Sequence, residues 1–132
     1  MTQPISDLKL MISGMEPVLN PGTYAYASIA HGVSIEKLHP VATMREVEGL
    51  TVIVAEQEAE ENGLTILYRC AWITLNVHSD LNACGLTAAF AKALADATIS
   101  CNVVAGAFHD HIFVPVDLAQ SALTALKQLQ QL

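Results

Sequence analysis

The feature of this sequence that most limits its fold is a change in hydrophobic period within residues 72–97. Residues 72–78 alternate bulky apolar side chains with polar or small ones, the period of two that is typical of a half-buried strand. From Leu86 onward the apolar residues, Phe90 and Leu94 among them, recur at helical spacing and form one face. A polar loop that ends in Gly85 separates the two patterns. The stretch therefore predicts a strand, a loop and a helix.

Two more strands and a second helix are predicted after this unit. Residues 99–108 and 112–116 are rich in β-branched or aromatic side chains, which are typical of strands. The polar triplet 109–111 between them suits a tight connection, so we expect a hairpin. Asp117 is a residue type that favours a helix N-cap, and an apolar face follows it at helical spacing. The predicted order is β-α-β-β-α.

The first part of the chain carries a looser version of the same pattern. We expect a helix over 6–15, strands over 23–29, 41–46 and 50–55, and an acidic helix over 56–62. Each half is then one strand short of six elements. Residues 64–78 are long enough to serve both halves, so we predict that strands are exchanged between the halves, or between subunits.

The second half resembles an ACT domain, a βαββαβ ligand-sensing module. The loop Asn82-Ala83-Cys84-Gly85-Leu86 occupies the place where that family has Asp-x-Pro-Gly between its first strand and first helix, with Asn for Asp and Cys for Pro. Together with residues 102–106 and 109–111, the resemblance covers residues 65–132. It implies an α+β fold of two ferredoxin-like (ACT-like) halves, residues 1–63 and 64–132, with strand exchange between them.

Composition and charge exclude several classes of partner. The chain has 132 residues, 52% of them hydrophobic and 14% charged, with a net charge of -7 and no basic run. Neither nucleic acid nor an anionic membrane is therefore an expected partner. The high apolar fraction favours a homodimer or a higher homo-oligomer. The first residues lack the pattern of a signal peptide, and we expect a cytoplasmic protein.

The candidate ligand site is the loop 79–86 together with polar residues that follow it. Backbone N–H groups at the start of a helix favour a carboxylate or phosphate, although Asp80 and Asn82 acting as plain helix caps would give the same pattern. The resemblance extends the site to the hairpin. The predicted ligand-binding residues are Ser79, Asp80, Asn82, Cys84, Gly85, Leu86, Asn102, His109, Asp110 and His111.

The residues give little indication of catalysis or of a metal. His109 and His111 have the i, i+2 spacing that can place two imidazoles on one face of a strand, but a zinc site needs more ligands, and a polar hairpin turn is the simpler interpretation. No motif of a known catalytic class is present. We expect neither a catalytic residue nor a cofactor.

The resemblance implies a regulatory or sensor protein, not an enzyme, that binds a small metabolite, most simply an amino acid. Two alternatives stay open from the residues: a structural dimerisation module without a ligand, and a small cysteine- or metal-dependent enzyme built around Cys84 or the histidines.

Overall fold

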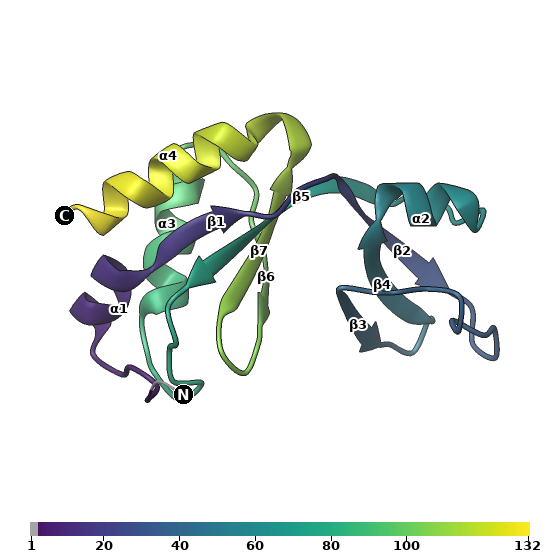
Figure 1. The fold of residues 1–132 in the computed structure, drawn as a ribbon, viewed down its shortest axis with the longest axis horizontal. Helices are drawn as coiled ribbons and strands as arrows, with labels where there is room; N and C mark the ends of the chain where they lie inside the picture. Colours follow the sequence, from purple (N-terminus) through teal and green to yellow (C-terminus); the bar gives the residue numbers. More distant parts are fainter. Residues whose placement is uncertain (1–2) are drawn as a thin grey trace. The chain divides into compact units, whose positions relative to one another are not determined.

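The computed structural model describes residues 3–132, which form two compact units (Figure 1). The discontinuous unit contains the residues up to Asn20 and Ala71–Leu132, and the continuous unit contains Pro21–Cys70. The elements in chain order are α1 (Leu8–Gly14), β1 (Glu16–Leu19), β2 (Tyr24–Ile29), β3 (Ala42–Arg45), β4 (Leu50–Ala55), α2 (Glu56–Glu61), β5 (Tyr68–Asn76), α3 (Leu86–Asp96), β6 (Asn102–Ala105), β7 (Asp110–Pro115), the 3-10 turn η1 (Val116–Leu118) and α4 (Ala119–Gln130).

The discontinuous unit is a complete βαββαβ set whose last strand comes from the start of the chain. Its strands lie in the order β1-β5-β7-β6, and β1 pairs antiparallel with β5, Glu16 opposite Asn76. Helices α3 and α4 contact each other and share one core with the strands. Its fully buried side chains include Met11, Met15, Ile73, Leu75, Phe90, Leu94, Ile112, Val114 and Leu126.

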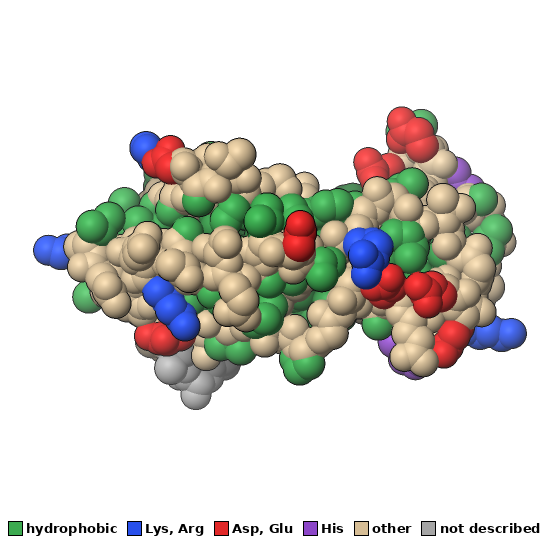
Figure 2. All heavy atoms as spheres, turned by 90° about the horizontal axis from the view of Figure 1, so that it is seen from above, with side chains coloured by type: hydrophobic (Ala, Val, Ile, Leu, Met, Phe, Trp, Pro, Cys, Tyr) green, Lys and Arg blue, Asp and Glu red, His purple; other side chains and the backbone are tan. Residues whose placement is uncertain are grey.

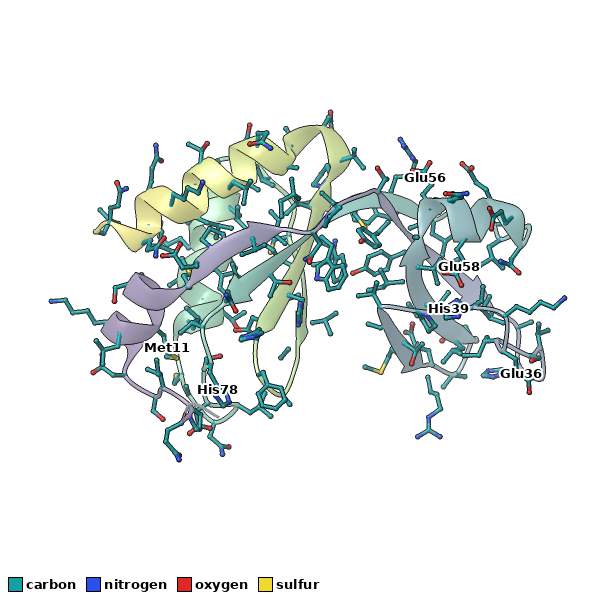
Figure 3. All side chains as sticks on the ribbon, in the orientation of Figure 1. Met11, Glu36, His39, Glu56, Glu58 and His78 are labelled. Atoms are coloured by element: carbon teal, nitrogen blue, oxygen red, sulfur yellow. The ribbon has the colours of Figure 1, made fainter. Side chains whose placement is uncertain are left out.

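The continuous unit has the same strand plan with one helix missing. Its strands lie in the order β3-β4-β2-β5, and β2 pairs with β5 over Tyr24–Tyr26. Residues 30–41 form an irregular connection where the first helix of a βαββαβ unit would stand, and Ile35 and Leu38 from it pack on the small core. The His39 backbone N–H donates to the Glu58 carboxylate of α2, and Figure 3 labels both residues in the continuous unit.

The units differ from the sequence halves 1–63 and 64–132. β1 belongs to the first half but completes the unit of the second half, because its backbone pairs with β5. β5 is long enough to pair with β2 through Tyr68–Cys70 and with β1 through Ile73–Asn76. The predicted exchange of strands between the halves is therefore confirmed within one chain.

Two local predictions were wrong. Residues 16–19, for which the sequence predicted no strand, form β1. The predicted hairpin connection at 109–111 lies earlier in the chain, because Gly106 N–H donates to His109 O and closes the turn there. Asp110 and His111 therefore belong to β7.

No helix among residues 3–132 is long and apolar enough to cross a membrane. Acidic side chains gather on the continuous unit (Figure 2), which holds seven of the 13 acidic residues of the chain.

Candidate functional site

The loop between β5 and α3 is folded around Asp80. Its Oδ1 accepts the Asn82 backbone N–H at 2.9 Å, and its carbonyl accepts the Ala83 N–H at 2.9 Å. This is an Asx-type turn, in which a short carboxylate takes the place of a backbone acceptor. The Asp80 side chain therefore shapes the loop by accepting the backbone N–H of Asn82, and neither of these two residues caps α3, as the capping interpretation would require.

An N-terminal strap, residues 5–8, fixes the loop from outside. Ile5 N–H donates to His78 O at 2.7 Å, and Asp80 N–H donates to Ile5 O at 2.9 Å. Ser6 Oγ donates to Asp80 Oδ2 at 3.1 Å. Nothing in the sequence near residue 80 indicated this contact, because the two segments lie more than 70 residues apart.

Gly85 is the N-cap of α3 and has a positive φ of 107°. A Cβ at this position would lie 3.0 Å from Leu8 Cδ2 of the strap. Gly85 is thus required by the backbone turn and by the strap. No side chain among residues 3–132 caps α3, and the N–H groups of its first turn have no acceptor within the helix.

A pocket of about 300 Å³ opens at this end of α3. Six of the ten predicted site residues line it: Ser79, Asp80, Cys84, Gly85, Leu86 and Asp110. Leu81 and Ala83, from within the predicted loop 79–86, also line it, and the sequence missed only Met11, Thr87 and Ala105. Ala105 could have been found from the hairpin register, since it pairs with Asp110, whereas Met11 comes from α1 and carries no local signal. Figure 3 shows Met11 and His78 at this end of the discontinuous unit.

Asp110 is the most unusual member of the pocket lining. It is the only buried charged side chain among the described residues, with 8% of its surface exposed. Its carboxylate has no hydrogen-bond donor among residues 3–132. Every fully buried side-chain oxygen or nitrogen in these residues has a hydrogen-bond partner, so the Asp110 oxygens are not fully buried and reach solvent. Burial raises the pKa of Asp110, and the neighbouring His111 opposes this shift.

Four predicted site residues are absent from the pocket lining. Asn82 is exposed, and Asn102 lies on the edge strand β6 opposite Phe113. His109 Nδ1 lies 3.3 Å from Val77 O. His111 follows Asp110 in β7 and therefore points to the opposite face of the sheet, so these two side chains do not line the same pocket.

The described residues offer no group of three or more His, Cys, Asp or Glu side chains that could hold a metal. Of the three free cysteines, only Cys84 is exposed. Burial raises the pKa of the Cys70 thiol to about 12 and that of Cys101 to about 11, so both thiols stay protonated at neutral pH.

Two models of the ACT domain match the sequence, over residues 3–71 and 67–128. No curated protein matches the chain. A crystal structure of a Vibrio cholerae protein, described as of unknown function and a possible transport protein, is 44% identical, covers 94% of this chain and 96% of its own, and gives a TM-score of 0.85.

Two more distant structures share the fold. A protein from Agrobacterium tumefaciens is 13% identical, covers 88% of this chain and 89% of its own, and gives a TM-score of 0.74. The regulatory subunit of aspartate kinase from Thermus thermophilus is 12% identical, covers 88% of this chain and 97% of its own, and gives a TM-score of 0.64. These identities bear on the fold alone.

Proposed function

The chain belongs to the ACT domain family, and from this premise we propose that it is a non-catalytic regulatory protein that binds an amino acid in the pocket at the start of α3. The family match and the fold shared with regulatory subunits of aspartate kinase support a ligand-binding regulatory role. An amino acid is the ligand that the family resemblance implied, and the lining of this pocket supports it.

The observation that carries the proposal is the buried carboxylate of Asp110 without a donor. A ligand ammonium group would supply the missing donors and a compensating charge. The first turn of α3, which lines the same pocket through Leu86 and Thr87, presents backbone N–H groups to a ligand carboxylate. The two groups together match the two ends of an α-amino acid.

The pocket size restricts the ligand. A volume of about 300 Å³ lies at the low end of the range for small-molecule sites. Apolar side chains, among them Leu81, Ala83 and Leu86, supply the remaining wall. We therefore propose a single amino acid in preference to a nucleotide or a peptide.

A thermal-shift screen of the standard amino acids, each added alone, tests the proposal. A ligand at about 100 times its Kd stabilises the native state by about 2.7 kcal/mol, which is a readily measured change in Tm. The amino acid that raises the Tm of the wild type most should not raise the Tm of Asp110→Asn. The same compound without its amino group should not raise the Tm of the wild type. Asp117→Asn, which alters an exposed carboxylate on η1, is the matched control.

The screen contradicts the proposal if no amino acid raises the Tm. It also contradicts the proposal if the ligand that does so stabilises Asp110→Asn as much as the wild type. In the second case the ligand binds elsewhere.

We also propose that the chain forms a homo-oligomer. The alternative function, a structural dimerisation module without a ligand, would require this as well. β3 and β6 end the strand order of their units, and no strand among residues 3–132 pairs with their outer edges. Each carries an exposed apolar side chain, Met44 at 63% and Val103 at 37%. Sedimentation at micromolar concentration should show a species larger than one chain, and a single species at the mass of one chain contradicts the proposal.

A further inference from the structure

His111, which the ligand pocket leaves unused, has a built environment of its own in the discontinuous unit. Its Nδ1 lies 3.1 Å from Trp72 Nε1 and 3.1 Å from Thr74 Oγ1, both on β5. Thr74 Oγ1 in turn accepts the Asn20 side-chain amide at 2.9 Å. These contacts join β7 to β5 through a partly buried chain of hydrogen bonds.

The donors in this chain fix the protonation state of His111. The indole N–H of Trp72 can only donate, so Nδ1 of His111 must present its lone pair. The imidazole is therefore neutral and carries its proton on Nε2. Adding a second proton places an N–H on Nδ1, facing the indole N–H at a distance where only a donor and an acceptor are compatible.

The charges around His111 oppose a second proton. Its pKa is lowered by burial, and His109 lowers it further, whereas the carboxylate of Asp110 acts in the opposite direction. The flanking strands add no charge near His111, because β6 and the part of β5 from Ala71 to Asn76 carry no titratable side chain.

We propose that His111 is a proton-sensitive latch between β5 and β7. When the imidazole is neutral, Trp72 donates to it and the latch is closed. When it gains a proton on Nδ1, the bond from Trp72 is lost and the new N–H turns to Thr74 Oγ1, which has lone pairs to accept it. Because Asp110 precedes His111 on β7, opening the latch adds a positive charge next to the pocket carboxylate. This charge would regulate ligand binding in the pocket, a consequence that rests on the proposed function.

The latch can be tested without any ligand because Trp72 is the only tryptophan of the chain. Its fluorescence should fall along one titration curve between about pH 8 and about pH 5, since an imidazolium beside an excited indole withdraws an electron from it. The midpoint should lie below 6.5, the ordinary value for histidine. His111→Asn keeps an acceptor near the Nδ1 position but does not titrate, so its emission should stay flat over this range.

His109→Asn is the matched control. His109 lowers the pKa of His111, so this variant should raise the midpoint without abolishing the titration. Nitrogen NMR of the wild type adds a measurement that needs no variant, and it should show the Nε2–H tautomer of His111 at high pH.

An Nδ1–H tautomer would overturn the latch. So would a wild-type emission that does not change with pH, or a titration that persists unchanged in His111→Asn. A failed ligand screen would leave these results untouched, so the latch and the proposed ligand fail separately.

Discussion

Replacing Asp110 by asparagine should stabilise the protein at neutral pH, although it removes the group on which the proposed ligand depends. The carboxylate is 8% exposed and has no hydrogen-bond donor among residues 3–132. In the unfolded chain water solvates this charge fully, so folding loses solvation and gains no partner for it. Asparagine has nearly the same shape and no charge, so the substitution removes the charge without opening a cavity.

The size of the gain follows from the burial. An unpaired buried polar group costs about 1–3 kcal/mol in proteins, and more when it is charged. The cost for Asp110 lies at the low end of this range because its oxygens reach solvent. The amide of asparagine is also polar, so the variant keeps part of the cost of burial. We therefore expect Asp110→Asn to raise the free energy of unfolding by about 1 kcal/mol near pH 7.

The dependence on pH gives the prediction a second signature. Burial raises the pKa of Asp110 above its ordinary 3.8, so the native state binds this proton more tightly than the unfolded state does. The contribution of Asp110 to stability therefore falls as the pH rises from 3.8 through the raised pKa. The variant lacks this contribution, so its advantage should be largest at neutral pH and shrink as the solution is acidified.

Urea unfolding at a series of pH values measures both effects, since a change in the midpoint at constant slope reports stability alone. Asp117→Asn, an exposed change of the same chemistry, should alter stability by less than about 0.5 kcal/mol. A loss of stability of about 1 kcal/mol or more in Asp110→Asn at neutral pH would show instead that the carboxylate is satisfied within the fold.

Three further predictions concern the packing around the pocket. Gly85→Val should cost at least about 1–2 kcal/mol in urea unfolding, because the backbone has a positive φ and the new side chain meets Leu8, and a variant as stable as the wild type would show that this loop relaxes freely. Phe90→Ala, at a fully buried position of α3, should cost about 3–5 kcal/mol in the same assay, and a loss below about 1 kcal/mol would contradict the described core. Ser6→Ala should cost less than about 1 kcal/mol but speed hydrogen exchange at the Asp80 amide, and unchanged exchange there would show that the strap does not depend on the bond between the two side chains.

The elements with a strong hydrophobic period were predicted correctly, since their local pattern and their burial agree. Leu86, Phe90 and Leu94, which defined the apolar face in the sequence, are the buried residues of α3. β1 was missed for a physical reason. It has four residues and contains Pro17, so it lacks the alternation of a strand, and only its pairing with β5 some 60 residues away makes it one.

The candidate site was predicted in part because two of its walls come from one segment and the others do not. The loop and the start of α3 are adjacent in sequence, so Ser79 and Leu86 could be placed together from the pattern. Asp110 followed from the family resemblance. The neighbouring histidines do not line the pocket with it. The sequence pattern suggested a turn at the polar triplet, whereas Asp110 and His111 belong to a strand, in which successive side chains point to opposite faces. The strap has no signal in the sequence.

The use of β1 to complete the discontinuous unit also sets an order of events during synthesis. The residues of the continuous unit, 21–70, form an unbroken run, so that unit can fold as soon as it leaves the ribosome. β1 is made earlier but stays unpaired until β5 has been made, and the Gln130 side chain later donates to Ser13 O and to Glu16 beside it. At about 5–20 residues per second, the interval between the end of β1 and the end of β5 is on the order of 3–10 s. For that time a nascent chain carries β1 as a strand whose partner does not yet exist.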